Sequence, residues 1–360
     1  MQQINVTKTY LPALEEYTAY LQGIWDRGHL TNHGPLLQDL EEKLKKHLGV
    51  KHLFVVNNGT IALQIAIKAL DLKNEIITTP FSYVATTSSI AWESCTPVFA
   101  DIDPKTLCIN PDEIKKKITP STTGILATHV YGIPCNVEAI KEIAEQNNLK
   151  VIYDAAHAFG VNYKRTSVLN YGDISTLSFH ATKLFHTIEG GAIITNDDEL
   201  AHKISYMRNF GHNGPEAFFG VGINGKTSEF NAAMGLSILP KVPDLIEARK
   251  RISELYDELL KNTSLEKPEL PEKTEYNYAY YPVLFKSELQ LLEVRKKLND
   301  NLVFPRRYFY PSLNTLNYVG KQEALISEDI SKRVLCLPIY FDLLESAVRK
   351  VASIITETLQ

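Results

Sequence analysis

The sequence has few cysteines and lacks any long apolar run. Four cysteines occur in 360 residues, and Cys95, Cys108, Cys135 and Cys336 lie far apart without a CxxC pair. This spacing argues against a disulfide framework and a zinc site, so no metal ligand set is predicted. No run approaches the roughly 20 apolar residues of a membrane helix. The first residues, MQQINVTKTYLP, lack an apolar signal segment. We therefore expect no membrane association and a cytoplasmic location.

A strong excess of basic residues is also missing. The formal net charge is −4, so the composition does not predict a nucleic-acid-binding surface. Hydrophobic residues make up 44% and charged residues 22%, which is typical of a soluble globular protein. At about 100–200 residues per domain, the length suits one large domain with a smaller one, or two comparable ones.

What the sequence does have is a regular alternation of strand-like and helical stretches through its first two thirds. Apolar strand-like runs lie at 53–57, 75–80, 97–103, 123–132, 150–160 and 191–197. Helical stretches lie at 59–70, 82–94, 112–118, 137–148 and 198–208. This alternation predicts an α/β fold with a mostly parallel central sheet covered on both faces. Ligands bind such sheets beyond the carboxyl ends of the strands, so the site is expected there.

The pattern changes near the segment PKVP at 240–243. A charged helical stretch follows at 244–262, and shorter strand and helix segments follow it. We therefore place a domain boundary near residue 245. The expected division is a large ligand-binding domain at 1–245 and a small C-terminal α+β domain at 246–360.

One glycine-rich segment matches a motif of another class of protein. Residues 220–227 read GVGINGKT, which satisfies the phosphate-cradling pattern of P-loop nucleotide hydrolases. That pattern is meaningful only between a buried strand and a helix. A helical stretch follows, but the preceding RNFGHNGPEAFF is rich in glycine and broken by proline. We interpret the segment as a glycine-rich loop that leads into a helix, and keep the nucleotide hydrolase as a remote alternative.

Three positions suit a cofactor that forms an imine with a lysine. Lys183 lies in SFHATKLFHTIEGG, and a buried lysine with a lowered pKa can act as nucleophile and proton carrier. Asp154 ends the strand-like run KVIYD, where a carboxylate can pair with a protonated pyridine nitrogen. Gly59 and Thr60 occupy a strand-to-helix turn that can bind phosphate. Taken singly, each has an ordinary structural explanation: a surface lysine, a solvated carboxylate and a helix cap.

The order of these positions resembles one enzyme family over nearly the whole chain. The matching segments, in order, are HLTNHGPLLQDLEEKL, NNGTIAL, TPFSYVAT, DIDP, THVYG, YDAAHAFG, SFHATKLFHTIEGG, GINGKTSEFNAAMG, RRYFYPSL and LCLPIY. The sequence is similar to the DegT/DnrJ/StrS sugar aminotransferases, pyridoxal-phosphate enzymes of the aspartate-aminotransferase fold (type I). The resemblance implies transfer of an amino group from glutamate to a nucleotide-linked keto sugar, with pyridoxal 5′-phosphate as cofactor.

The resemblance also implies roles for individual residues. Lys183 is expected to be catalytic, joining the cofactor as an imine and moving the proton. The expected cofactor-binding residues are Gly59, Thr60, Tyr83, Asp154, His157, Ser178, Lys183 and Asn224. Asp154 would contact the pyridine nitrogen, and Tyr83 would stack on the ring. His157 stands where the family usually has glutamine, near the cofactor's phenolic oxygen. The expected substrate-binding residues are His180, Lys226, Arg306, Arg307 and Tyr308.

Two further implications concern assembly and substrate. Asn224 matches the family asparagine that reaches the phosphate of the neighbouring subunit, so we expect a homodimer with shared active sites. Lys226 replaces the usual arginine of that loop. The EGG after Lys183 resembles the branch that acts at C4, which favours dTDP-4-keto-6-deoxyglucose. The alternatives are a 3-aminotransferase acting on a dTDP-3-keto-6-deoxyhexose and an enzyme for UDP- or GDP-sugars.

Overall fold

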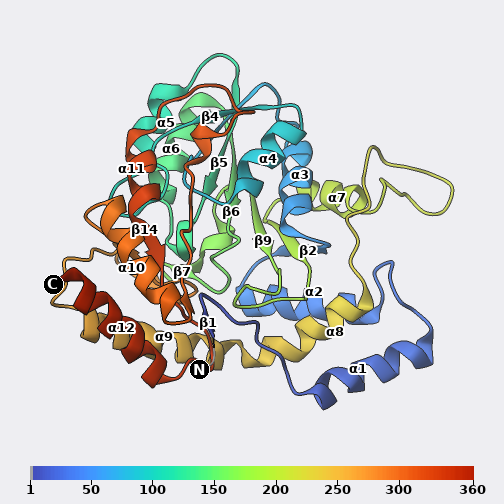
Figure 1. Cartoon of the computed structure of the whole chain (residues 1–360). Helices are drawn as coiled ribbons and strands as arrows, with labels where there is room; N and C mark the ends of the chain where they lie inside the picture. Colours follow the sequence, from blue (N-terminus) through green and yellow to red (C-terminus); the bar gives the residue numbers. More distant parts are fainter. Residues whose placement is uncertain (1–2) are drawn as a thin grey trace.

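A seven-stranded sheet forms the centre of the protein, whose structure, a computed structural model, describes residues 3–360 (Figure 1). The strands lie in the order β2 (His52–Val56), β10 (Gly191–Thr195), β9 (Ile174–Ser178), β6 (Lys150–Asp154), β5 (Thr122–Thr128), β3 (Glu75–Thr78) and β4 (Thr96–Phe99). Strand β10 pairs antiparallel with both of its neighbours, and the other pairs in the sheet are parallel. The predicted α/β fold with a mostly parallel sheet is therefore confirmed.

Successive side chains of the strands enter different hydrophobic clusters on opposite faces of the sheet. In β10, for example, Ile193 packs with α3 (Gly59–Ala69) and α7 (Asp198–Met207), whereas Ile194 packs with α2 (Pro35–Leu48) and α8 (Glu229–Ile238). Because side chains of a strand alternate between faces, a run of consecutive apolar residues predicts a strand covered on both sides. This explains why the runs were recognisable in the sequence.

The other described elements surround this sheet. The remaining helices are α1 (Leu14–Arg27), α4 (Val84–Trp92), α5 (Pro111–Lys117), α6 (Val137–Asn147), α9 (Val242–Leu260), α10 (Glu288–Asp300), α11 (Leu325–Arg333) and α12 (Glu345–Leu359). Short 3-10 turns are η1 (Val130–Gly132), η2 (Val168–Asn170), η3 (Leu239–Lys241) and η4 (Leu313–Thr315). Small strand groups are β1 (Ile4–Asn5) with β13 (Val303–Phe304), β7 (Asn162–Tyr163) with β8 (Thr166–Ser167) and β11 (Thr274–Glu275), and β12 (Pro282–Leu284) with β14 (Val334–Cys336).

Helix α9 connects the large sheet to a separate C-terminal core. Near its start, Val242 and Leu245 belong to the cluster under β2 and β10, whereas Ile252 and Tyr256 belong to a cluster with α10 and α12. The position at which we placed the domain boundary lies inside this helix. The division into 1–245 and 246–360 stays a prediction, and the N-terminal strand β1 crosses it by pairing with β13.

Strand β9 was not among the strands predicted from the sequence. Its residues, ISTLS, lie between β10 and β6 in the sheet, with Ser175 and Thr176 buried. Serine is common in turns, and the run holds only two apolar residues, so it lacked the apolar signal of the other strands. The strand matters because its carboxyl end carries Ser178 and leads directly to Lys183.

Candidate active site

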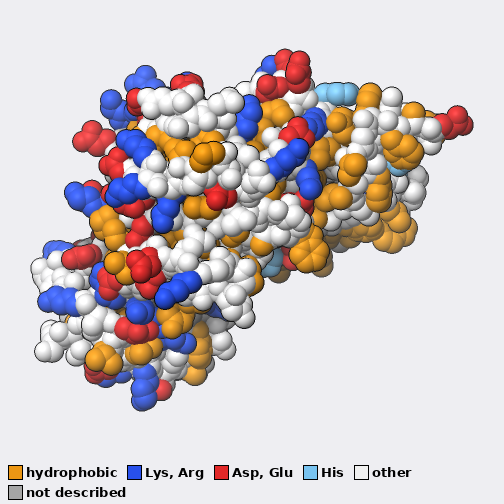
Figure 2. All heavy atoms as spheres, turned by 90° about the horizontal axis from the view of Figure 1, so that it is seen from above, with side chains coloured by type: hydrophobic (Ala, Val, Ile, Leu, Met, Phe, Trp, Pro, Cys, Tyr) orange, Lys and Arg blue, Asp and Glu red, His pale blue; other side chains and the backbone are white. Residues whose placement is uncertain are grey.

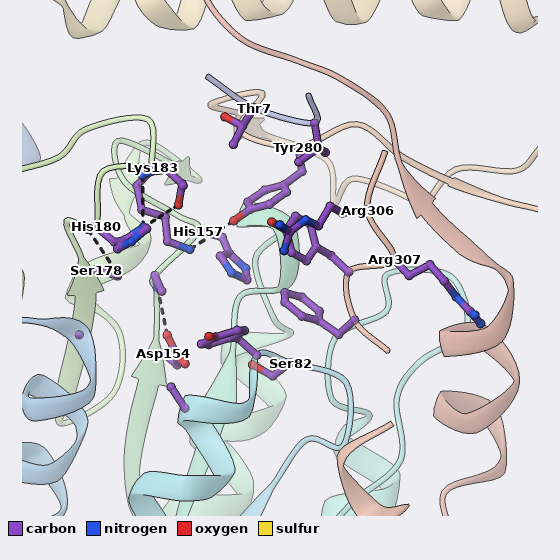
Figure 3. A pocket seen from close by; sticks show the side chains of 18 of the residues that line it. Thr7, Ser82, Asp154, His157, Ser178, His180, Lys183, Tyr280, Arg306 and Arg307 are labelled. Carbon is purple, nitrogen blue, oxygen red and sulfur yellow. Dashed lines mark hydrogen bonds between the residues drawn. The ribbon is translucent and has the colours of Figure 1, made fainter. Parts of the chain in front are cut away.

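Most of the predicted site residues converge on one cavity at the carboxyl edge of the sheet. The cavity has a volume of about 1100 Å³ and lies beyond the ends of the parallel strands β2, β6 and β9. The predicted residues that line it are Gly59, Thr60, Tyr83, Asp154, His157, Ser178, His180, Lys183, Arg306, Arg307 and Tyr308. Figure 3 shows Lys183, Asp154 and His157 approaching this space from neighbouring loops and strand ends.

Lys183 reaches the cavity from the turn after β9. Its Nζ donates a hydrogen bond of 3.3 Å to the hydroxyl of Tyr280, and within residues 3–360 it forms no ion pair (Figure 3). Burial lowers the pKa of the Lys183 ammonium, and the charge of Asp154 opposes that effect. A buried amine with a lowered pKa can exist partly in its neutral form, which is what nucleophilic and proton-transfer chemistry needs.

Asp154 ends β6 and is buried. Its Oδ2 accepts a hydrogen bond of 2.7 Å from the Thr86 hydroxyl, and its Oδ1 accepts one of 3.1 Å from the Ala156 N–H. The Ser82 and Thr86 hydroxyls are 2.8 Å apart, and Thr128 donates to Ser82, so a chain of hydroxyls leads to the carboxylate. Burial raises the pKa of Asp154, because the charged form is poorly solvated there, although the hydrogen bonds from Thr86 and Ala156 favour the charge.

His157 is buried beside the lysine and has one defined tautomer. Its Nδ1 accepts the N–H of Tyr131 at 3.2 Å, so this nitrogen carries no proton and the neutral ring carries its hydrogen on Nε2. The ring stacks on Phe309 and meets the edge of Tyr280, which fixes its orientation. Burial, together with the charge of Lys183, lowers the pKa of His157 well below its usual range. His157 is therefore a neutral hydrogen-bond donor.

The turn between β2 and α3 forms a cradle for an anion. Asn58 caps α3 by accepting the N–H of Ile61 at 2.8 Å, and the Gly59 and Thr60 backbone lies at the positive end of the helix dipole. A Cβ built on Gly59 would lie 3.0 Å from the Ser178 Cβ, a tighter contact than most side chains make, so glycine suits the close approach of the turn to the end of β9. The cradle thus brings helix N–H groups next to the Ser178 hydroxyl.

Tyr83 and His180 stand nearer to solvent than Lys183. Tyr83 precedes α4 and is 59% exposed, so its ring is available to a ligand that enters the cavity. His180 Nδ1 is 2.8 Å from the Thr182 hydroxyl, and Nε2 lies 3.6 Å from Glu189. His186, which also follows β9, is instead buried, with Nε2 2.7 Å from the Tyr10 carbonyl and Nδ1 accepting from Ile188. These hydrogen bonds give His186 a place in the packing of the fold.

The two adjacent arginines of the loop after β13 face different ways. The Arg307 guanidinium pairs with Glu288 at 2.7 Å, donates to the Lys332 carbonyl and lies over the Tyr310 ring, and Figure 3 shows it pointing away from Lys183. The exposed Arg306 side chain has no hydrogen-bond or ion-pair partner within residues 3–360, and it lines the cavity. Arg307 therefore supports the loop, whereas Arg306 is free to bind a ligand.

Asn224 and Lys226 do not join the cavity of their own chain. They lie in the α7–α8 loop (208–228), which projects from the large domain (Figure 1). Lys226 Nζ donates to Asn224 Oδ1 at 2.7 Å and lies over the Phe210 ring. Within the described residues, no strand leads into GVGINGKT, and α8 is capped by Ser228. The motif thus lacks the strand–loop–helix context of a P-loop.

Several cavity residues were missed by reasoning from the sequence. They are Gln3, Asn5 and Thr7 near the N-terminus, Ser82, Tyr280, Arg295 and Asn299. Arg295 and Asn299 are one helical turn apart on α10, so they share a face, but such spacing also occurs on ordinary exposed helices. Tyr280 lies in NYAYYPVLF, where several tyrosines gave no sign of which one faces inward.

The donor set fits pyridoxal 5′-phosphate. The cradle at Gly59, Thr60 and Ser178 offers hydrogen-bond donors to a phosphate, and Lys183 offers an amine to an aldehyde. The buried carboxylate of Asp154 has no cationic hydrogen-bond partner within residues 3–360, so it suits the protonated nitrogen of a pyridine ring. Within the same residues, no cluster of three or more histidine, cysteine or acidic side chains could hold a metal ion.

Comparisons with known proteins agree with this geometry. The profile of the DegT/DnrJ/EryC1/StrS aminotransferase family matches residues 13–356. The dTDP-4-amino-4,6-dideoxy-D-glucose transaminase of Shigella dysenteriae is 44% identical over 361 residues, 98% of each chain. The GDP-perosamine synthase of Escherichia coli O157:H7 is 31% identical over 97% of each chain. The crystal structure of DesI in the presence of its TDP-sugar product superposes with a TM-score of 0.94 at 30% identity, covering 100% of this chain and 94% of DesI. The chain therefore belongs to the DegT/DnrJ/EryC1/StrS aminotransferase family and is a transaminase whose cofactor is pyridoxal 5′-phosphate.

Proposed function

We propose that this protein transfers the amino group of glutamate to C4 of a dTDP-4-keto-6-deoxy sugar, dTDP-4-keto-6-deoxyglucose. The observation that carries the proposal is the 44% identity, over 98% of both chains, to a dTDP-4-amino-4,6-dideoxy-D-glucose transaminase. The cavity supports it, because about 1100 Å³ exceeds what the cofactor alone needs and leaves room for a nucleotide-linked sugar.

Lys183 and Asp154 divide the acid–base work. When bound, pyridoxal 5′-phosphate supplies an electron sink that stabilises negative charge at the reacting carbon. With the cofactor bound, the Lys183 amine would take the proton from that carbon and return it on the other side of the imine nitrogen, in a 1,3-shift. Its lowered pKa keeps part of the amine neutral, as a general base must be. The Asp154 carboxylate sits where it can pair with the ring nitrogen and hold it protonated.

His157 and the cradle orient the cofactor. His157 would donate its Nε2 hydrogen to the phenolic oxygen of the bound cofactor, where the family usually uses glutamine. The defined tautomer supports this role, because the Tyr131 N–H already occupies Nδ1. The N–H groups of Gly59 and Thr60 and the hydroxyl of Ser178 would hold the phosphate, and Tyr83 would lie against the ring. His180 and Tyr308, which also line the cavity, would flank the sugar.

Two arginines on the small-domain side bind the diphosphate of the nucleotide sugar. Arg295 on α10 and Arg306 after β13 both line the cavity, and neither guanidinium has an ion-pair partner within residues 3–360. The planar guanidinium of an arginine matches two oxygens of a phosphate. Two such groups without ion-pair partners therefore favour a ligand with two negative charges. Arg307 serves this subsite indirectly, by fixing the loop through Glu288.

The active protein is a homodimer in which the α7–α8 loop completes the neighbouring cofactor site. Asn224 and Lys226 lie outside their own cavity, which supports a contact with the partner's phosphate. The loop carries exposed apolar side chains, with Phe218 62% and Val221 86% exposed. Figure 2 shows apolar side chains gathered on the projecting side at the right. Such a contiguous apolar surface is typical of an interface.

The proposal is tested by incubating the holoenzyme with a panel of nucleotide-linked keto sugars and glutamate labelled with nitrogen-15. We expect the label in the product from dTDP-4-keto-6-deoxyglucose, with NMR placing it on C4, and no product from Lys183→Ala. A faster reaction with a 3-keto sugar or with a UDP- or GDP-linked sugar would contradict the assigned substrate. Such a result would leave the transaminase activity intact.

A further inference from the structure

Tyr280 is the hydrogen-bond partner that the structure gives to the Lys183 amine. The distance from Nζ to the Tyr280 hydroxyl is 3.3 Å, and Lys183 Nζ also lies 6.0 Å from the centre of the Tyr280 ring. Within residues 3–360 the amine has no other side-chain hydrogen bond. A half-buried amine with one hydrogen-bond partner depends on that partner for both its position and its charge.

The segment that carries Tyr280 is tied to the segment that carries His157. The Asn277 side-chain amide donates to the carbonyls of His157 and Phe159 at 2.9 and 3.0 Å, and its oxygen accepts the N–H of Ala279 at 3.1 Å. Arg249 donates to the Ala279 carbonyl at 3.1 Å. These bonds hold the backbone immediately before Tyr280 in place.

The ring of Tyr280 is also packed on three sides. It meets the edge of His157 at 4.9 Å between centres, tilts against Tyr131 at 5.6 Å and meets Tyr308 at 6.0 Å. Burial raises the pKa of the phenol, so the hydroxyl stays protonated and adds no charge of its own. The result is a neutral dipole held at a fixed point above the lysine.

We propose that Tyr280 is a positioning residue, whose hydroxyl holds the Lys183 amine whenever that amine is not joined to the cofactor, and keeps it aimed at the carbon that it must deprotonate. The proposal rests on the function assigned above only in taking Lys183 as the proton carrier. The phenol oxygen accepts a hydrogen bond from the ammonium form and can donate one to the neutral amine, so it holds the side chain in both states.

The charge of the Lys183 amine sets the direction of the expected change in its pKa. A hydrogen bond to an ammonium is roughly twice as strong as one to a neutral amine. Loss of the hydroxyl should therefore lower the pKa of Lys183 further, by roughly one unit. The other titratable groups that act on this amine or are acted on by it remain in place; they are Tyr83, Asp154, His157 and Tyr308.

The experiment compares Tyr280→Phe with Tyr281→Phe. Tyr281 is the next residue, but its hydroxyl bonds to Asp257 in the C-terminal core, so the control removes the same group from the same segment. The full-length chain is freed of cofactor by dialysis against a competing amine. Reductive methylation of Lys183 is then followed against pH by peptide mass spectrometry, which yields the pKa of the amine without any catalytic turnover.

We expect the midpoint for Lys183 modification to fall by about one unit in Tyr280→Phe and to stay unchanged in Tyr281→Phe. In the holoenzyme, kcat should fall roughly tenfold with little change in KM, and the acidic limb of its pH profile should move in the same direction, to lower pH.

A native midpoint in Tyr280→Phe would overturn the proposal. If that variant does not fold, 3-fluorotyrosine at position 280 weakens the same oxygen as an acceptor and should shift the midpoint in the same direction. Failure of the assigned sugar to react would leave the methylation result standing, so the two ideas fail separately.

Discussion

The Thr86 hydroxyl donates a hydrogen bond of 2.7 Å to the buried carboxylate of Asp154. Thr86 lies on α4, the helix that follows β3, and Asp154 lies at the end of β6, so the bond joins a covering helix to a central strand. The Ser82 hydroxyl lies 2.8 Å from the Thr86 hydroxyl, and the Thr128 hydroxyl donates a hydrogen bond to the Ser82 hydroxyl. The carboxylate that is assigned to the cofactor nitrogen is thus held by a chain of hydroxyls.

Thr86→Val should therefore weaken the cofactor site without unfolding the protein. The substitution keeps the shape and removes one hydrogen bond to a charged group, worth roughly 1.5–3 kcal/mol. We expect the affinity for pyridoxal 5′-phosphate to fall about tenfold or more, measured by fluorescence titration. Thr87→Val is the matched control, because the Thr87 hydroxyl is buried next to Thr86 without a hydrogen-bond partner within residues 3–360. Equal affinities in the two variants would show that the chain does not support Asp154.

Asp154→Asn tests the charge itself. The amide keeps the size of the side chain but cannot supply the negative charge that holds the pyridine nitrogen protonated. We expect a folded protein that binds cofactor and loses most of its transamination, by a factor of about a hundred or more. Single-turnover kinetics with glutamate would measure this loss directly. Turnover within a few-fold of the native rate would remove Asp154 from the mechanism.

Arg295→Ala and Arg306→Ala should each raise the KM for the nucleotide sugar. A charge-assisted hydrogen bond to phosphate contributes roughly 1.5–3 kcal/mol, so about a tenfold to hundredfold increase is expected. The KM for glutamate should change little. Arg349→Ala is a control that removes the same charge from the surface of α12, where Arg349 pairs with Glu345 at 4.0 Å. If the KM values for both substrates rise together, the arginines bind carboxylates as well as diphosphate.

The sequence predicted the strands, helix starts and site residues that can be recognised from neighbouring positions in the chain. Apolar runs such as that of β10 reveal a strand covered on both faces, and the turn at Gly59 reveals a helix start. Tyr280 and Arg295 could not be found in this way, because their function depends on how the C-terminal segments fold back over the sheet. Nothing in NYAYYPVLF distinguishes the tyrosine that faces Lys183 from its neighbours.

The same limit applies to the paired arginines. Arg306 and Arg307 are equivalent in the sequence, yet Glu288 on α10 engages only Arg307. The local pattern indicated a basic loop, and tertiary packing decided which of its two charges is left without a protein partner within residues 3–360. The domain boundary near residue 245 is a similar case, since the sequence changes in character within a helix that both cores share.

His129 makes the stability of the fold sensitive to acid. The ring is fully buried, and burial lowers the pKa of His129 to about 3. The unfolded chain binds a proton near pH 6.5, so between those values it binds more protons than the folded chain does. Stability is therefore complete above about pH 6.5, and His129 alone reduces it by roughly 1.4 kcal/mol for each pH unit below that value.

Urea unfolding between pH 4 and 7 measures this dependence. We expect His129→Asn to lower stability at neutral pH, because the ring stacks on Tyr153 and accepts the Cys135 N–H at 3.1 Å. Its stability should then fall less steeply as the pH decreases. Burial also lowers the pKa values of His47, His157 and His186, so the slope is reduced and not abolished. Parallel curves for His129→Asn and the exposed-site control His202→Asn would contradict the prediction.

Mixing two inactive variants tests whether the active sites are shared. Lys183 lines the cavity of its own chain, whereas Asn224 lies outside it on the α7–α8 loop. Lys183→Ala and Asn224→Ala should each be impaired as homodimers, because every site in them carries one lesion. In a mixed dimer, however, both lesions fall in the same site, and the other site is intact. Unfolding and reassembling the two variants together should therefore restore activity, up to about half of the native value per mixed dimer.

Reassembly of each variant alone is the control, and mass spectrometry of differently tagged chains confirms that mixed dimers form. No recovery despite mixed dimers, together with ATP hydrolysis that depends on Lys226, would favour the P-loop interpretation of GVGINGKT over the shared site.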